Sequence, residues 1–290
     1  MLRLSAEEIL SNMDPKEDPC NDFYRYTCGR FVDKAIIPDG ESWVSQFTKI
    51  DYQLKKDLRH IVEKPIGSGE LPAFRVVKTM YASCMNQSQI NLLGLDVLKD
   101  VLDRIGGWPV VLGSEWNDLH FTWSSLMYEY RKMGFSIGYF IEFSVAGDMK
   151  NSSRNILKID QPTLGLDRVY LMKGLDDDVV QAYYDYMAKL AILLGAAPDR
   201  AQLELREVLQ FQILLANYLL PNEERRNSTN LYNKMTITEL RLRWPSIPWH
   251  DYVNEMLAPF HNVTPEEPVN IVAPAYIDKF VGALEITPKR

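Results

Sequence analysis

Histidines are the first side chains to consider, because they hold catalytic zinc and transfer protons in many hydrolases. The sequence has four of them, His60, His120, His250 and His261. The common zinc site on a helix needs two histidines at positions i and i+4, with a glutamate directly after the first, and no pair here meets that requirement. His250 is followed by Asp251 and stands eleven residues before His261, a spacing that matches no common zinc pattern. We therefore expect no catalytic residue and no metal ligand in this chain.

Other hydrolytic and nucleotide-binding chemistries also lack their motifs. The glycines are scattered and form neither a G-x-G-x-x-G nor a G-x-x-x-x-G-K-[ST] phosphate loop. No G-x-S-x-G elbow and no cysteine–histidine signature supplies an activated nucleophile. The three adjacent aspartates at 176–178 fit the first turn of a helix better than a calcium site, because their spacing does not match an EF-hand loop.

The chain has three cysteines, Cys20, Cys28 and Cys84, which are candidates for disulfide bonds. An odd number leaves at least one thiol without an internal partner in an oxidising compartment. Cys20 and Cys28 could pair with each other. A helix between them would make that pair awkward, because seven or eight helical residues separate its ends by about 10–12 Å.

Four N-x-[ST] sequons are candidate N-glycosylation sites and would suit an ectodomain. Their asparagines are Asn86, Asn151, Asn227 and Asn262. Pro265 directly follows the last sequon and weakens it.

Composition excludes several classes of partner. The net charge of −7 and the pI near 5.3 argue against nucleic acid and anionic membranes, which both require a basic face. No apolar run is long enough to span a membrane, and the first residues lead into Ser5-Ala6-Glu7-Glu8 rather than into the apolar core of a signal peptide. With 290 residues, 46% of them hydrophobic, the chain can bury one large core or two ordinary ones.

The stretch from Met13 to Phe47 has the clearest local signals. Asp14-Pro15 and Asp18-Pro19 are non-helical dipeptides, so a helix should begin only after them, with Asn21 or Asp22 as its N-cap. That helix is strongly aromatic and needs a large packing partner. The turn at residues 36–40 precedes a second helix, for which Ser42 or Asp39 is the expected cap.

The rest of the chain is predicted to be mainly α-helical, as a bundle-like set of helices with a small antiparallel β-hairpin around residues 135–159. Apolar residues alternate from 135 to 143, a turn follows at 148–153, and residues 155–159 return as the partner strand. Apolar periodicity and breakers predict helices at 41–63, 72–89, 95–105, 115–133, 176–195, 200–220, 236–242, 250–257 and 276–284.

Several motifs occur in an order that is similar to one protein family. The first combines D-P, P-C-x-D-F-Y-x-Y-x-C-G and I-P-D-G, all between Met13 and Phe47. The others are Y-A-S-C-M-N at 81–86, G-W-P at 107–109, I-D-Q-P at 159–162 with Gly165-Leu166, L-Y-N-K-M-T at 231–236 and A-P-A-Y at 273–276. This series resembles the N-terminal portion of the neprilysin and endothelin-converting-enzyme family of zinc metallopeptidases.

The resemblance implies that the family's proteins have an N-terminal and a C-terminal half with different roles, and that this chain corresponds to the N-terminal half. In the family, the zinc helix, the glutamate ligand downstream of it and the N-A-[FY] substrate-binding strand belong to a C-terminal half without a counterpart here. Residues 1–48 would form an N-terminal wrapping segment of the peptidase ectodomain, and residues 49–290 a helical lid domain, incomplete at its C-terminal end. The implied activity is proteolysis of small peptides with zinc as the cofactor of the full-length protein. We expect this chain to be inactive alone.

Further expectations follow from the resemblance. In neprilysin, an arginine binds the terminal carboxylate of a peptide. Trp43 stands at that position here and cannot form the same charge-assisted bonds. Cys20, Cys28 and Cys84 are each implied to pair with cysteines of the C-terminal half. The expected partners are small peptides and the catalytic half or a full-length homologue, at the cell surface or outside the cell. The alternative is a non-catalytic extracellular module that binds a peptide or a protein.

Overall fold

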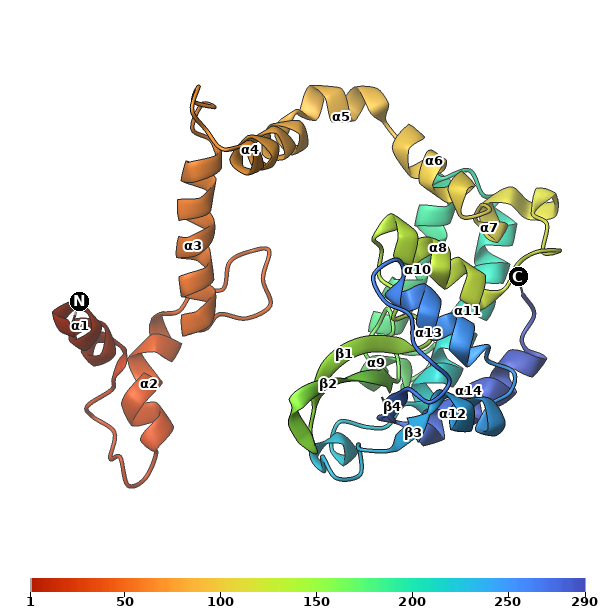
Figure 1. Cartoon of the computed structure of the whole chain (residues 1–290). Coiled ribbons are helices and arrows are strands. Elements are labelled where there is room, and N and C mark those ends of the chain that lie inside the picture. Colours follow the sequence, from red (N-terminus) through yellow and green to blue (C-terminus); the bar gives the residue numbers. More distant parts are fainter. Residues whose placement is uncertain (1, 290) are drawn as a thin grey trace. The chain divides into compact units, whose positions relative to one another are not determined.

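The computed structural model describes residues 2–289 of the chain, with side chains from residue 6 onward. The chain divides into two compact units, unit 1 at residues 1–93 and unit 2 at residues 94–290. Figure 1 shows that unit 1 consists of helices and loops, whereas unit 2 combines helices with a small sheet. The predicted fold class, mainly α with a small β-hairpin, is confirmed.

Unit 1 contains α1 (Leu2–Asn12), α2 (Phe23–Lys34), α3 (Gln46–Val62), α4 (Pro72–Met85) and α5 (Gln87–Leu93). The predicted start of α2 is confirmed, because the Asp22 side chain accepts a hydrogen bond from the Arg25 backbone N–H at 2.8 Å. The cap of α3 is Ser45, not Ser42 or Asp39. Ser45 and Thr48 form a capping box that satisfies two backbone N–H groups at once, which explains the later start.

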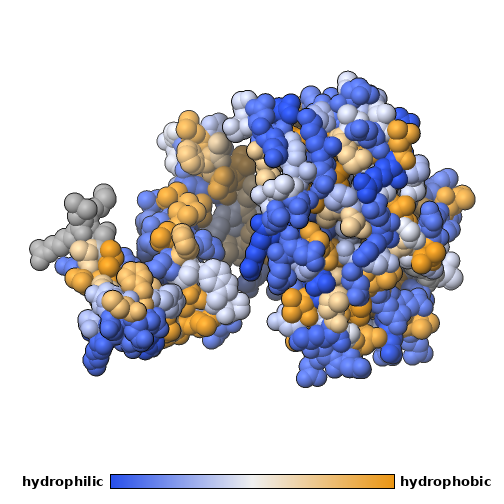
Figure 2. Space-filling model, turned by 90° about the horizontal axis from the view of Figure 1, so that it is seen from below, coloured by the Kyte–Doolittle hydropathy of each residue, from blue (hydrophilic) through white to orange (hydrophobic). Residues whose placement is uncertain are grey.

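Unit 1 has almost no buried core. Among residues 6–93 only Gly29 and Lys78 are buried. The Lys78 ammonium lies 2.6 Å from a carboxylate oxygen of Glu70 and 3.4 Å from the carbonyl oxygen of Pro65, so this contact fastens the α3–α4 loop. Large apolar side chains are exposed instead, and hydrophobic groups reach the surface in many places in Figure 2.

Unit 2 contains helices that pack on one another and on its sheet. They are α6 (Asp96–Arg104), α7 (Pro109–Leu112), α8 (Trp123–Met133), α9 (Arg168–Leu171), α10 (Asp178–Leu193), α11 (Pro198–Tyr218), α12 (Ile237–Arg243), α13 (Trp249–Leu257) and α14 (Pro274–Ile286), with 3₁₀ turns at Gly113–Glu115 and Glu224–Arg226. Helix α8 begins eight residues later than predicted. Thr122 and Ser125 form a capping box there, and residues 113–121 are a 3₁₀ turn and loops.

The sheet has four strands in the order β1-β2-β4-β3. They are β1 (Glu142–Asp148), β2 (Asn151–Asp160), β3 (Lys234–Thr236) and β4 (Pro268–Ile271). β1 and β2 form the predicted antiparallel hairpin, β4 runs parallel to β2, and β3 is antiparallel to β4. The first strand starts at Glu142 instead of residue 135. The aromatic rings of Phe135 and Tyr139 pack edge-on against Tyr130 of α8, so their alternation reflects packing on a helix.

The main core of unit 2 lies where α8, α13 and α14 meet the sheet. Trp249, Tyr252, Tyr276 and Phe280 are its largest fully buried side chains. The Tyr276 hydroxyl donates a hydrogen bond to the carbonyl oxygen of Phe140 at 2.8 Å, so the polar end of this buried ring is satisfied. Unit 2 therefore has the core that unit 1 lacks.

Candidate functional site

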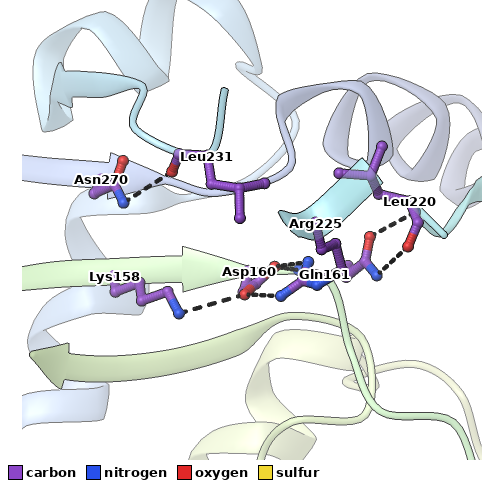
Figure 3. A network of polar contacts seen from close by, with 7 residues as sticks. All are labelled: Lys158, Asp160, Gln161, Leu220, Arg225, Leu231 and Asn270. Atoms are coloured by element: carbon purple, nitrogen blue, oxygen red, sulfur yellow. Dashed lines mark hydrogen bonds and ion pairs between the residues drawn. The ribbon is translucent and has the colours of Figure 1, made fainter. Parts of the chain in front are cut away.

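Asp160, the last residue of β2, is the centre of a polar network in unit 2 (Figure 3). Its side chain is 8% exposed. Arg225 donates two hydrogen bonds to it, from Nη1 to Oδ1 at 3.0 Å and from Nη2 to Oδ2 at 2.8 Å. The Lys158 ammonium lies 3.5 Å from Oδ2. Two parallel charge-assisted bonds make this a strong and geometrically specific pair.

Gln161 extends the network to the end of α11. Its side-chain nitrogen donates to the carbonyl oxygen of Leu220 at 3.1 Å, and its side-chain oxygen accepts from the Leu220 N–H at 2.7 Å. Figure 3 shows both bonds beside the Asp160–Arg225 pair. The end of β2 thus holds the start of the connecting segment, defined here as residues 219–233 between α11 and β3.

The other end of the connecting segment is held by Asp148 and Asn270. Tyr232 donates a hydrogen bond from its hydroxyl to Asp148 Oδ1 at 2.8 Å. Asn270 of β4 donates from Nδ2 to the Leu231 carbonyl oxygen at 3.2 Å and accepts from the Asn233 N–H at 2.8 Å. The connecting segment therefore follows the sheet from Asp160 to Asp148, fixed at both ends by buried polar side chains.

Asp148 is 1% exposed. The pKa of its carboxyl falls from 3.8 to about 2, because the Lys150 N–H, the Arg154 guanidinium and the Tyr232 hydroxyl all donate hydrogen bonds to the carboxylate. The contribution of Asp148 to stability is therefore complete above its ordinary pKa and is lost as the pH falls through 4 toward 2.

This linkage gives a prediction for Asp148→Asn. The free energy of unfolding of the variant should be lower than that of the parent at pH 6, and the difference should shrink as the pH falls from 4 toward 2. Chemical denaturation followed by circular dichroism at several pH values measures it. A difference that stays constant down to pH 2 would show that the Asp148 charge does not stabilise the hairpin.

A groove of about 360 Å³ lies beside the Asp160 network. It is lined by Glu142, Arg225 and residues 160–164, 167–169 and 219–223. Its most buried carboxylate, Asp160, is already bound to Arg225. Within residues 2–289 no group of three or more histidine, cysteine, aspartate and glutamate side chains could hold a metal ion. The polar groups of this region hold β2 and the connecting segment together.

The four histidines lie apart along the chain. His60 belongs to α3 and His250 to α13, whereas His120 and His261 lie in loops. His250 Nε2 is 3.1 Å from the Val263 carbonyl oxygen and 3.2 Å from Asn254 Nδ2, so this side chain ties α13 to the loop after it.

The remaining candidate residues are distributed over both units. Cys20 and Cys84 are exposed, Cys28 is half-buried inside α2, and all three are free thiols. Trp43 is 56% exposed and precedes α3. The four sequon asparagines are all exposed: Asn86 between α4 and α5, Asn151 at the start of β2, Asn227 in the connecting segment and Asn262 after α13.

Comparison with known proteins decides the family. A sequence model of peptidase family M13, for its N-terminal region, matches residues 19–290. Neprilysin-2 of Drosophila melanogaster is 38% identical over 287 residues, and human endothelin-converting enzyme 1 is 30% identical over 287 residues. The chain belongs to peptidase family M13.

The M13 relatives are much longer than this chain. The matches to neprilysin-2 and to human endothelin-converting enzyme 1 cover 99% and 98% of this chain but only 37% and 36% of those proteins. Among solved structures, the Mycobacterium tuberculosis zinc metalloprotease Zmp1 in complex with an inhibitor superposes with a TM-score of 0.74 at 18% identity, over 97% of this chain and 41% of Zmp1. PepO of Lactobacillus rhamnosus gives a TM-score of 0.66 at 17% identity, over 94% and 41%. These two structures show that the fold is shared.

M13 peptidases use zinc, and the described residues do not fit that metal. No cluster of three or more histidine, cysteine, aspartate and glutamate side chains that could hold the metal exists among residues 2–289. Two of the motifs that resemble the family instead supply residues of the polar network. I-D-Q-P supplies Asp160 and Gln161, and L-Y-N-K-M-T supplies Tyr232 and Asn233. None of the helices in the described part of the chain has the length and apolarity needed to cross a bilayer.

Proposed function

We propose that this chain is the N-terminal, mainly helical lid portion of a neprilysin-like zinc metalloendopeptidase that cleaves small peptides outside the cell, and that it is inactive without the catalytic portion. In this proposal the chain limits access to the substrate cavity, and the catalytic portion supplies zinc and its ligands. Family membership supports the parent activity. The absence of a possible metal cluster among residues 2–289 supports inactivity of the chain alone.

The proposal that the chain packs on a catalytic portion rests on one observation, the apolar surface of α3. Five apolar side chains recur at spacings of three and four residues and are between 49% and 81% exposed. They are Phe47, Ile50, Leu54, Leu58 and Ile61. Such a stripe on a helix is the pattern of a buried face. Because it is exposed here, we infer that it packs on the catalytic portion of the complete enzyme.

The alternative, a finished binding module, predicts a self-sufficient fold. Unit 1 has almost no buried core, and the apolar stripe of α3 is exposed. Both observations favour the proposal that the chain is the lid portion of a larger enzyme. In the proposed enzyme the thiols of Cys20, Cys28 and Cys84 form disulfides with the catalytic portion.

The test is reconstitution. The purified full chain should bind no stoichiometric zinc and should not cleave a small fluorogenic peptide in a chelator-sensitive way. Addition of the catalytic portion of neprilysin-2, produced separately, should restore chelator-sensitive cleavage to the mixture. Ile50→Asp should weaken reconstitution at least tenfold, because it places a charge in the inferred contact. Lys56→Asp, also on α3, is the matched control and should have little effect.

Zinc bound by the chain alone together with chelator-sensitive cleavage would overturn the claim of inactivity. If Ile50→Asp and Lys56→Asp reconstituted equally well, the α3 stripe would not be the contact surface.

A further inference from the structure

β1 is an edge strand of the sheet (Figure 1). Residues 142–147 pair one to one with residues 155–160 of β2, and no further strand of the described chain lies on the other side of β1. Edge strands of natural proteins commonly carry a proline or a lysine that prevents pairing with another chain. The sequence of β1, E-F-S-V-A-G-D, has neither. β1 is therefore able to accept another strand.

The backbone groups of Phe143 and Val145 face the open side of β1. The Ile159 carbonyl oxygen accepts a hydrogen bond from the Val272 N–H at 2.8 Å, so Ile159 directs its backbone groups toward β4. In an antiparallel pair, residues that do not bond to each other direct their N–H and C=O groups to the two outer sides. Phe143, opposite Ile159, and Val145, opposite Leu157, therefore direct theirs away from β2. No described residue supplies a partner for these four groups, and such a row binds an extended polypeptide.

The core face of the sheet is incompletely covered at β1. Directly opposite residues of neighbouring strands share a face, so Phe143 and Val145 lie on the same face as Ile159 and Leu157. Ile159 and Leu157 are 0% and 6% exposed, whereas Val145 is 53% exposed. A strand added to β1 with apolar side chains opposite Phe143 and Val145 would continue this apolar face.

Glu142 lies on the opposite face of β1 and lines the groove beside the Asp160 network. Asp160 binds Arg225, and Asp167 accepts a hydrogen bond from the Val169 N–H at the start of α9. Glu142 and the other exposed glutamate of the groove, Glu223, form no ion pair among residues 6–289. Four carboxylates and two guanidinium groups line the groove, so its net charge is negative and it complements a cation. They belong to Glu142, Asp160, Asp167, Glu223, Arg168 and Arg225.

We propose that β1 binds an extended peptide as an additional antiparallel strand, with apolar residues opposite Phe143 and Val145 and a lysine or arginine opposite Glu142. Read from its N-terminus, the core of such a peptide is apolar, any residue, apolar, basic. The apolar side chains continue the core face, and the basic side chain reaches the groove. That this peptide is a substrate of the complete enzyme rests on the proposed function, whereas its binding to β1 does not.

The first experiment varies the peptide. Fluorescence anisotropy measures the Kd of the full chain for a fluorescein-labelled peptide with V-T-V-K at its centre, which should bind saturably. N-methylation of both valines removes the N–H groups that would donate to the Phe143 and Val145 carbonyl oxygens, so the Kd should rise about tenfold or more. A peptide with V-T-V-E at its centre should also bind more weakly, because it places a carboxylate beside Glu142.

The second experiment varies the chain. Val145→Pro removes one outward N–H and no bond to β2, so it should raise the Kd for the V-T-V-K peptide about tenfold. Val145→Thr keeps the N–H and is the matched control. The double variant Glu142→Gln/Glu223→Gln should raise the same Kd about two- to fivefold. Glu224→Gln changes a neighbouring carboxylate outside the groove and should have no effect. The glutamate variants decide the question if Val145→Pro does not fold.

Failure of the V-T-V-K peptide to bind saturably, or equal binding of its N-methylated form, would overturn the proposal. Sedimentation tests a second occupant: a dimer of the parent chain that Val145→Pro dissociates would assign β1 to another copy of the chain. Loss of reconstitution in Val145→Pro, without peptide binding by the parent, would assign β1 to the catalytic portion. Either result would show the proposal to be wrong. If the parent chain itself bound the peptide but failed to reconstitute activity, only the proposed function would fail.

Discussion

Replacing Asp160 by alanine is expected to lower the free energy of unfolding of unit 2 by about 3–5 kcal/mol. The side chain is 8% exposed and binds both Nη atoms of Arg225. Its removal leaves a guanidinium without its partner and frees the connecting segment at one end. Losing one member of a buried ion pair costs more than the pair itself contributes, because the remaining charge stays desolvated.

Asp100→Ala is the matched control. Asp100 pairs with Arg104 on α6 at 2.8 Å, but these side chains are 61% and 67% exposed. Exposed pairs contribute at most about 1 kcal/mol, so the change should be small. Urea denaturation followed by tryptophan fluorescence reports on unit 2, because all tryptophans except Trp43 lie there. Equal effects of Asp160→Ala and Asp100→Ala would show that the Asp160–Arg225 pair does not stabilise unit 2.

The sequence predicted the helices well because their signals are local. The cap at Asp22, the proline at the start of α4 and the apolar stripe of α3 all act within a few residues. β3 and β4 were not predicted. They are three and four residues long, and β4 pairs in parallel with β2 more than one hundred residues away, so no periodicity marks either strand.

The polar network was predictable only in part. Asp160, Gln161 and Tyr232 belong to motifs that indicated the family, but the motifs gave no role for these side chains. Their partner Arg225 lies in the charged stretch 222–226, outside all of those motifs. The contact joins residues 65 positions apart, and it forms only because β2 and the end of α11 lie side by side. Such pairing depends on tertiary structure and not on local pattern.

Phe280→Ala is expected to lower the free energy of unfolding of unit 2 by about 3–5 kcal/mol, because it removes a fully buried ring and leaves a cavity. Phe280 lies on α14, and its ring centroid is 5.7 Å from those of Tyr276 and Trp123 and 5.8 Å from that of Phe140. The Phe280 ring therefore joins α14 to α8 and to the segment that precedes β1, which are distant in sequence.

Phe260→Ala makes the same chemical change at a side chain that is 85% exposed, and it should alter stability by less than about 0.5 kcal/mol. Urea denaturation and near-ultraviolet circular dichroism measure both variants. A large difference between them would show that α14 belongs to the cooperative core of unit 2, so that unit 2 can fold from residues of this chain. Equal effects would mean that Phe280 and α14 are not part of the cooperative core of unit 2.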